Sequence, residues 1–247
     1  MCARARATSI RREQADHTRS AILRAASREF SQKGFDGAST VAIMDAAKVN
    51  TSLLYYYFKS KSGLYEAVIL NAVEEYVQYS TAILKSSTSP AERVLRAAVI
   101  HFDRYIHDQE AQRLLQQELL RFWSGGGEFA SLLAAKLFTP WLTRMKETIE
   151  QGIETGELRE MHWRQAIGAV LGANTFYFLN APLFGEVFGI DPLNKAELDA
   201  QRRGMVEFFG QTLFLDPARG SRVAGRVLAS MPMPRYRKVK RGESRTM

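Results

Sequence analysis

The sequence predicts an all-α protein of about nine helices, in which a small helix-turn-helix head of three helices precedes a larger helical bundle. Apolar residues recur at helical spacing along most of the 247 residues. Clusters of Gly, Ser and Pro separate these stretches and supply the residues that start and end helices. The sequence contains no convincing alternation of apolar and polar residues, which would indicate strands.

The first helix is expected over residues 18–33, where Ile22, Ala26 and Phe30 form one apolar stripe. Gly34 is placed to end this helix. The preceding residues 1–17 include Arg4, Arg6, Arg11 and Arg12, so we expect a loose basic arm that becomes helical near Ile10. Such an arm could follow a polyanion or enter a minor groove, or it could be a solvated tail.

Two short helices are expected next, over residues 40–47 and 51–57, with a tight break between them. Ser39 or Thr40 can cap the first, because its side-chain oxygen can accept a hydrogen bond from an otherwise unpaired backbone N–H. Asn50 is the expected cap of the second. A short capped helix with small polar residues at its start and aromatic residues further on suits the major groove of DNA, which admits one helix.

The remaining helices would form the bundle. Their expected ranges are 61–86, 90–107, 110–123, 128–154, from about 163 onward, and 194–214. Ser89 is the expected cap before Pro90, since proline is favoured at the first helical position. Residues 124–127 read Ser-Gly-Gly-Gly and are expected to connect two helices, because the Lys-Ser/Thr of a phosphate-binding loop does not follow them. Pro140 is expected to kink or restart its helix.

One stretch of the bundle, residues 166–185, carries no charged side chain. Its length would permit a membrane span. Asn174, Thr175, Asn180 and Pro182 instead favour a helix that is buried on both sides of a soluble bundle. We therefore expect no membrane among the partners of this chain.

Charge is unevenly distributed along the chain. Residues 1–62 carry a net charge of +6, residues 63–216 carry −6, and residues 217–247 carry +8. A basic head on an acidic body directs the head toward a polyanion and keeps the body away from it.

Candidate catalytic and metal-binding groups form no recognisable pattern. The four histidines, His17, His101, His107 and His162, lack the spacing of zinc ligands. Cys2 is the only cysteine, which excludes an intrachain disulfide and fits a reducing compartment.

Glu118 and Arg121 lie three residues apart on one expected helix and could act as acid and base. A helical ion pair is the better interpretation of this spacing. The first twenty residues lack the apolar segment of a signal peptide. We therefore expect a cytoplasmic protein that is not an enzyme and that holds no metal or cofactor.

Between Ile22 and Val68 a set of residues follows in a fixed order without a gap: Ile22, Ala25, Ala26, Phe30, Gly34, Phe35, Ser39, Ile43, Ala47, Val49, Leu54, Tyr55, Tyr57, Phe58, Lys61 and Leu64. In these residues the sequence resembles the DNA-binding domain of the TetR family of bacterial repressors. Two positions differ from the family pattern. Lys48 replaces the glycine that is usual in the turn, and Leu53 replaces a threonine that often contacts phosphate in the family.

The resemblance implies a DNA-binding surface centred on the third helix. The implied residues are Ser39, Thr40, Lys48, Asn50, Thr51, Ser52, Tyr55, Tyr56, Tyr57, Lys59 and Lys61. Lys61 and Tyr55 would hold the DNA backbone, while Thr51, Ser52 and Tyr56 would distinguish between bases.

The resemblance also implies that the bundle binds a small-molecule effector and forms a homodimer. Aromatic walls with a few polar groups describe a small-molecule pocket, although ordinary core packing explains many such residues. The candidate ligand-binding residues are His101, Phe102, Tyr105, Arg121, Phe122, Phe138, Trp141, Asn174 and Tyr177. The candidate dimer residues, on the last two helices, are Gly168, Gly172, Met205, Phe208, Phe209 and Leu213.

Together these inferences give one functional hypothesis. We expect a DNA-binding domain at residues 1–62, a ligand-binding and dimerisation domain at 63–216, and a basic, disordered tail at 217–247, within which 221–230 could be helical. The protein would be a transcriptional repressor that binds a palindromic double-stranded DNA operator as a homodimer and is released by an effector. The alternative is a helical small-molecule-binding protein or enzyme with a vestigial DNA-binding head.

Overall fold

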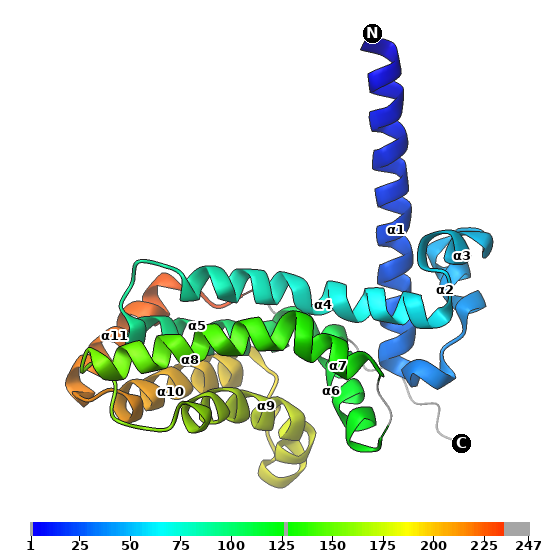
Figure 1. The fold of residues 1–247 in the computed structure, drawn as a ribbon. Helices are drawn as coiled ribbons and strands as arrows, with labels where there is room; N and C mark the ends of the chain where they lie inside the picture. Colours follow the sequence, from blue (N-terminus) through cyan, green and yellow to red (C-terminus); the bar gives the residue numbers. More distant parts are fainter. Residues whose placement is uncertain (1, 126–127, 235–247) are drawn as a thin grey trace. The chain divides into compact units, whose positions relative to one another are not determined.

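The computed structural model describes residues 2–125 and 128–234, and in this part of the chain helices are joined by turns and loops, with no strand (Figure 1). The helices are α1 (Cys2–Gly37), α2 (Thr40–Ala47), α3 (Ser52–Phe58), α4 (Lys61–Leu84), α5 (Pro90–His107), α6 (Gln109–Trp123), α7 (Glu128–Leu133), α8 (Thr139–Glu154), α9 (Trp163–Phe188), α10 (Lys195–Leu213) and α11 (Pro217–Ser230). A π-helical segment, Ala134–Phe138, joins α7 to α8 near Pro140. The predicted all-α class is confirmed.

The first helix is longer than predicted. α1 begins at Cys2, so the prediction of a loose arm before the first helix is wrong: the backbone is already helical there. No Gly or Pro precedes Gly34 in this segment, which is rich in Ala and Arg, and both residues favour helix. At Gly34 the backbone leaves the helical region (φ 70°, ψ 178°), so the helix is interrupted where the sequence indicated. Glycine reaches such a positive φ without strain because it has no Cβ.

The turn between α2 and α3 keeps its tight form although a lysine stands in it. Lys48 adopts the left-handed conformation (φ 57°, ψ 43°), and its N–H donates to the carbonyl of Asp45 at 3.0 Å. A left-handed residue with a Cβ costs about 1 kcal/mol more than glycine. Ser39 caps α2 as predicted, because its Oγ accepts a hydrogen bond from the N–H of Ala42.

The chain forms two compact units. The first unit contains the residues up to Glu75 together with Glu110–Ala135, and the second contains Tyr76–Gln109 and the residues from Lys136 onward. This division differs from the expected boundary at residue 62, because α4 continues through that position and α6 and α7 belong to the same unit as the head.

An aromatic and polar core holds the first unit together. The ring of Tyr65 lies 4.9 Å from that of Phe30 and 5.2 Å from that of Phe129, centroid to centroid. Tyr65 donates a hydrogen bond from its buried hydroxyl to Glu118 Oε2 at 3.1 Å. Glu118 therefore pairs with Tyr65, and not with Arg121 as predicted, while the Arg121 guanidinium lies 4.9 Å above the ring of Phe35.

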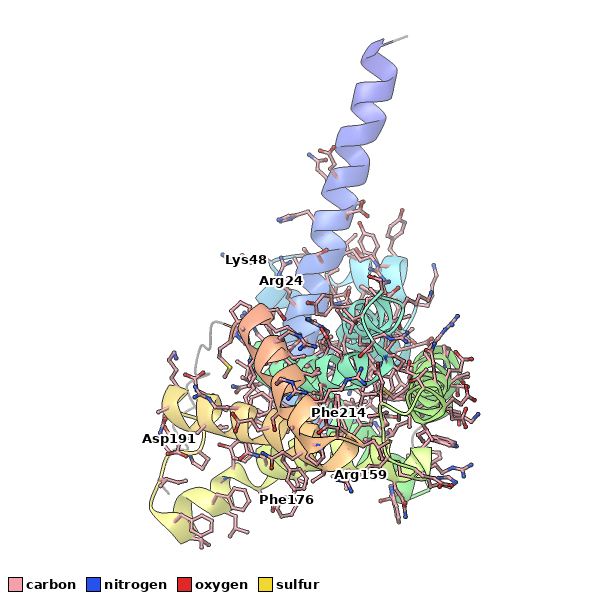
Figure 2. All side chains as sticks on the ribbon, turned by 90° about the vertical axis from the view of Figure 1, so that its left-hand side faces the viewer. Arg24, Lys48, Arg159, Phe176, Asp191 and Phe214 are labelled. Atoms are coloured by element: carbon pink, nitrogen blue, oxygen red, sulfur yellow. The ribbon has the colours of Figure 1, made fainter. Side chains whose placement is uncertain are left out.

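In the second unit α5 is the central helix, and α8, α9, α10 and α11 pack against it. Its cap is the predicted one, since Ser89 Oγ accepts a hydrogen bond from the N–H of Glu92 and Pro90 begins the helix. The turn after α8 is held to the end of α10, because Arg159 Nε donates to the carbonyl of Phe214 at 2.8 Å; both residues are labelled in Figure 2.

The segment predicted to be a disordered tail contains a folded helix. α11 buries Val223 and Val227 in the core of the second unit. Its packing on α10 is close, since a Cβ added at Gly210 would lie 2.7 Å from the carbonyl oxygen of Gly220. Arg219 of α11 also donates to Glu157 Oε1 at 2.7 Å. The basic run at residues 235–241 lies outside the described residues.

The uncharged stretch forms α9, which is long and apolar enough to cross a membrane by length and composition alone. The prediction that it is buried on both sides is wrong. Val170 and Asn174 are buried on one side, whereas Phe176, Leu179 and Leu183 are more than half exposed on the other. The exposed apolar side of α9 therefore remains available to a partner.

Candidate DNA-binding and ligand-binding sites

The candidate DNA-binding face of the head comprises exposed residues at the start of α2 and on the outer side of α3. Tyr55 and Tyr56 are 62% and 70% exposed, while Leu54 and Phe58 turn inward into the core of the head. Thr51, Ser52 and Ser39 are exposed as well. The predicted DNA-binding residues of α3 thus lie on one side of the helix, because its apolar residues use the other side for packing.

Asn50 and Tyr57 have local roles in this face. The Asn50 Oδ1 accepts a hydrogen bond from the N–H of Ser52 at 2.8 Å, so Asn50 organises the start of α3 with the group that could otherwise contact a base. Tyr57 is half-buried and packs edge-on against Tyr56, with ring centroids 4.9 Å apart. Val41, which the sequence reasoning did not select, is 56% exposed beside the half-buried Thr40 at the start of α2.

Three of the predicted lysines lie next to α3 in the chain, in the turn before it, directly after it and at the start of α4. Lys48 projects from the turn and is exposed (Figure 2). Lys59 Nζ donates to the carbonyl of Tyr56 at 3.3 Å. Lys61 Nζ donates to the carbonyl of Asp36 at 3.2 Å and lies 5.2 Å above the ring of Phe35. An ammonium group has three donors, so each of these lysines can still contact a phosphate.

Four of the predicted ligand-binding residues gather in the second unit. Asn174 Nδ2 donates to the carbonyl of Ala98 at 3.1 Å and lies 3.2 Å from His101 Nδ1. The ring of His101 lies edge-on to that of Tyr105, with centroids 5.5 Å apart. Trp141 is 3% exposed and belongs to the same core.

Tyr76, which the sequence reasoning did not select, joins these residues. Its ring lies 6.2 Å from that of His101 and 6.3 Å from that of Trp141. The guanidinium of Arg104 lies 4.5 Å above the Tyr76 ring. Helical spacing alone could not identify Tyr76, because α4 belongs to the first unit up to Glu75 and to the second unit from Tyr76 onward.

Burial sets the protonation of this cluster. Burial, assisted by the nearby Arg104 cation, lowers the pKa of His101 to about 3. Burial also raises the pKa of Tyr76, and Arg104 opposes that shift. His101 is therefore a neutral imidazole at physiological pH, and Tyr76 keeps its proton.

The other predicted ligand-binding residues are placed differently. Arg121 and Phe122 belong to the first unit, where Phe122 is more than half exposed. Phe102 is fully buried against Phe178, with ring centroids 5.0 Å apart. Tyr177 donates its hydroxyl hydrogen to the carbonyl of Pro192. Phe138 ends the π-helical segment and is half-buried.

The predicted dimer residues divide into two groups. Gly168, Gly172 and Phe208 are exposed, and a Cβ added at either glycine would meet no atom within 4 Å. Met205, Phe209 and Leu213 instead belong to the core of the second unit, because they lie on the side of α10 that faces that core. These three residues are therefore not available on a free surface. Within the described residues, no group of His, Cys, Asp and Glu could hold a metal ion.

Comparisons with known proteins agree with this geometry. A family model described as "Bacterial regulatory proteins, tetR family" matches residues 22–68, and one described as "Tetracyclin repressor-like, C-terminal domain" matches residues 90–208. The HTH-type transcriptional repressor NicS of Pseudomonas putida is 32% identical over 115 residues, which cover 47% of this chain and 54% of NicS. The chain thus spans about half the length of that relative.

Two further similarities extend over more of the chain. The HTH-type transcriptional regulatory protein RaaS of Mycobacterium tuberculosis is 30% identical over 166 residues, which cover 66% of this chain and 71% of RaaS. The crystal structure of a regulator from Thermobifida fusca is similar with a TM-score of 0.57 and 23% identity, over 77% of this chain and 95% of that chain. At this identity the structural likeness shows the fold alone.

Proposed function

Because the chain belongs to the TetR family of bacterial transcriptional regulators, we propose that it is a ligand-responsive repressor that binds a palindromic operator as a homodimer. Regulators of this family bind DNA and are not enzymes, so the enzyme form of the alternative is wrong. A cytoplasmic location is part of the proposal.

The exposed face of α3 is the observation that carries the DNA-binding proposal. Two tyrosines and two small polar residues are exposed to solvent at α3, whose other side packs against the core of the head. No acidic residue occupies the first turn of α3, so its positive N-terminal end is not neutralised there. The small residues at the start of α3 would meet base edges, and Tyr55 with the flanking lysines would hold phosphates.

Selection of bound sequences from a random duplex pool tests this function. We expect a two-fold symmetric sequence, with half-sites about one helical turn apart or a multiple of it. Lys61→Ala should weaken binding to all sequences alike and reduce the slope of log affinity against log salt by about one. Thr51→Ala and Tyr56→Ala should instead change the preferred bases.

The matched control is Tyr79→Ala, which removes an equally exposed tyrosine from α4. It should leave DNA binding unchanged. Footprints of wild-type strength from a variant carrying both Tyr55→Ala and Lys61→Ala would contradict the assignment of α3 as the DNA-reading helix.

The exposed side of α9 supports the dimer proposal. Gly168, Gly172, Phe176, Leu179 and Leu183 recur every three or four residues and therefore lie along one side of the helix. Phe208 presents a further exposed ring from α10. Such a continuous apolar side fits a second copy of the same surface across a two-fold axis.

Light scattering at micromolar concentration tests the dimer. Phe208→Arg should shift the protein toward monomer, because burial of an unpaired charge is costly. The control Leu120→Arg changes an exposed leucine of α6 and should keep the wild-type mass. A wild-type monomer would count against the proposed mode of operator binding, since two heads are needed to contact two half-sites.

The cluster around His101 supports effector binding in the second unit. Aromatic rings surround a few polar groups there, which is the composition of small-molecule sites. Because Tyr76 belongs to α4, the helix that begins at Lys61 directly after the head, a ligand at the cluster can act on that helix. An effector can release DNA only to the extent that it binds the two conformations with different affinity.

A further inference from the structure

Three buried polar atoms in the effector cluster have no hydrogen-bond partner among the described residues. They are the hydroxyl of Tyr76, the indole Nε1 of Trp141 and the amide Oδ1 of Asn174. Trp141 and Asn174 are 3% and 1% exposed. Buried polar groups in proteins are normally hydrogen-bonded, because leaving one unpaired costs the free energy of its lost hydration. Three such atoms in one cluster can therefore accept a common hydrogen-bonding partner.

The three residues are neighbours within the second unit. Asn174 contacts His101, the His101 ring lies 6.2 Å from Tyr76, and the Tyr76 ring lies 6.3 Å from Trp141. They come from α4, α8 and α9, while His101 comes from α5 between them. One bound molecule could therefore meet groups from four helices.

The hydrogen-bonding capacity of each atom is defined by its surroundings. The amide of Asn174 is oriented by Ala98, because only its Nδ2 can donate to that carbonyl. Its Oδ1 is therefore an acceptor that needs a donor. The Trp141 Nε1 can only donate, and the Tyr76 hydroxyl can donate or accept. A molecule that satisfies all three atoms must both accept and donate hydrogen bonds.

Charge restricts the molecule further. Arg104 is buried beside Tyr76, and its guanidinium disfavours a second cation in the cluster. A carboxylate could not donate to Asn174 Oδ1. Phe178 stacks on Tyr105, whose ring lies edge-on to His101, and it also packs against the fully buried Phe102. These rings favour an apolar body. The requirements together describe an uncharged head on an apolar skeleton.

We propose that the effector is a neutral, largely apolar compound whose polar head both accepts and donates hydrogen bonds, such as a primary amide or a hydroxy-carbonyl group. Trp141 and Tyr76 donate to its oxygen, and Asn174 Oδ1 accepts its N–H or O–H. The regulation of DNA binding by this ligand rests on the proposed function. The binding of the ligand to the cluster does not.

A matched series of ligands tests the proposal on the full-length protein by isothermal titration calorimetry. Phenylbutanamide carries the required head, phenylbutylammonium replaces it with a cation, and butylbenzene has no polar group. We expect the amide to bind most tightly and the ammonium compound least tightly. Trp141→Phe and Tyr76→Phe keep an aromatic ring and should each weaken amide binding by roughly threefold to tenfold, the worth of one hydrogen bond.

Control variants separate the lost hydrogen bond from a general disturbance. Trp163→Phe changes a tryptophan stacked with Arg164, and Tyr79→Phe changes an exposed tyrosine of α4, so both should keep the wild-type affinity. Butylbenzene binding should be the same in Tyr76→Phe as in the wild type, because this ligand has no group that contacts the hydroxyl.

Three results would overturn the assignment: no detectable binding of the amide, equal or tighter binding of the ammonium compound, or wild-type amide affinity in both Trp141→Phe and Tyr76→Phe. Binding of the selected operator is measured separately with and without the amide. If the amide binds as expected and DNA affinity stays the same, the ligand class stands and the proposed regulation by this site fails.

Discussion

Arg202 joins three segments of the second unit, and its substitution tests how that unit is held together. Its Nε and one of its terminal nitrogens donate to the two carboxylate oxygens of Asp103 on α5, at 2.7 and 2.8 Å. The same terminal nitrogen donates to the carbonyl of Met231 at 2.9 Å. The side chains of Arg202 and Asp103 are only 5% and 17% exposed. We expect Arg202→Met to destabilise the protein strongly, because it leaves a buried carboxylate without its cation.

The magnitude follows from this burial. Removal of one partner from a buried ion pair costs about 3 to 5 kcal/mol. Burial raises the pKa of Asp103, and the hydrogen bonds from Arg202 oppose that rise. Without Arg202 the carboxyl group therefore takes up a proton more readily, which limits the loss. We expect a decrease of about 3 kcal/mol in the free energy of unfolding.

Urea unfolding followed by circular dichroism, at one fixed protein concentration, measures this loss. The control Lys146→Met breaks the exposed pair with Glu150 and should cost less than about 1 kcal/mol. Combining Arg202→Met with Asp103→Leu should recover most of the stability, because both buried charges are then removed. A loss below about 1 kcal/mol for Arg202→Met, with an unchanged dependence on urea, would refute the assignment of Arg202 as a central contact.

Three further predictions concern single positions. Lys48→Gly should raise the free energy of unfolding by roughly 0.5 to 1 kcal/mol, because it removes a lysine held in the left-handed conformation. An unchanged melting temperature in thermal unfolding would show that Lys48 carries no strain. Gly220→Ala should lower it by roughly 1 to 3 kcal/mol, because the new Cβ would overlap the backbone of Gly210, whereas Gly225→Ala on the same helix meets open space and should be neutral or stabilising. The pKa of His101 is about 3 in the folded state, below its usual 6.5. The neutral imidazole therefore contributes to the free energy of unfolding above pH 6.5. This contribution is lost as the pH falls toward 3, with a slope of up to about 1.4 kcal/mol per pH unit. His101→Gln should flatten this acid limb in a stability series measured against pH, and an unchanged limb would show that other groups cause it.

Local signals in the sequence predicted two helix starts and the inward side of α3 accurately. The bounds of α2 and α5 agree with the capping residues Ser39 and Ser89, because a cap acts on backbone groups within three residues of itself. The inward direction of Leu54 and Phe58 also followed from spacing along one short helix. Predictions of this kind need no knowledge of distant parts of the chain.

The errors have a common physical origin in contacts between distant segments. α11 is ordered because Gly220 meets Gly210 closely and Arg219 reaches Glu157, and neither contact is visible in the composition of residues 217–230. On α10, the spacing groups Met205 with Phe209 but does not say whether that side faces the core or a partner. The sequence likewise does not show which part of the chain Arg121 faces. In the structure its guanidinium lies over the ring of Phe35 in the first unit, and not in the predicted ligand site.

The docking of α11 determines where the protein can be shortened. A chain cut after Asp216, the boundary that charge alone suggested, would uncover the apolar residues of α10 and α5 that Val223 and Val227 now cover. It would also take the Met231 carbonyl away from Arg202. Loss of DNA binding in such a shortened protein would reflect destabilisation of the second unit. It would not test whether the basic tail contacts DNA. Only removal of the residues beyond 234 examines the tail by itself.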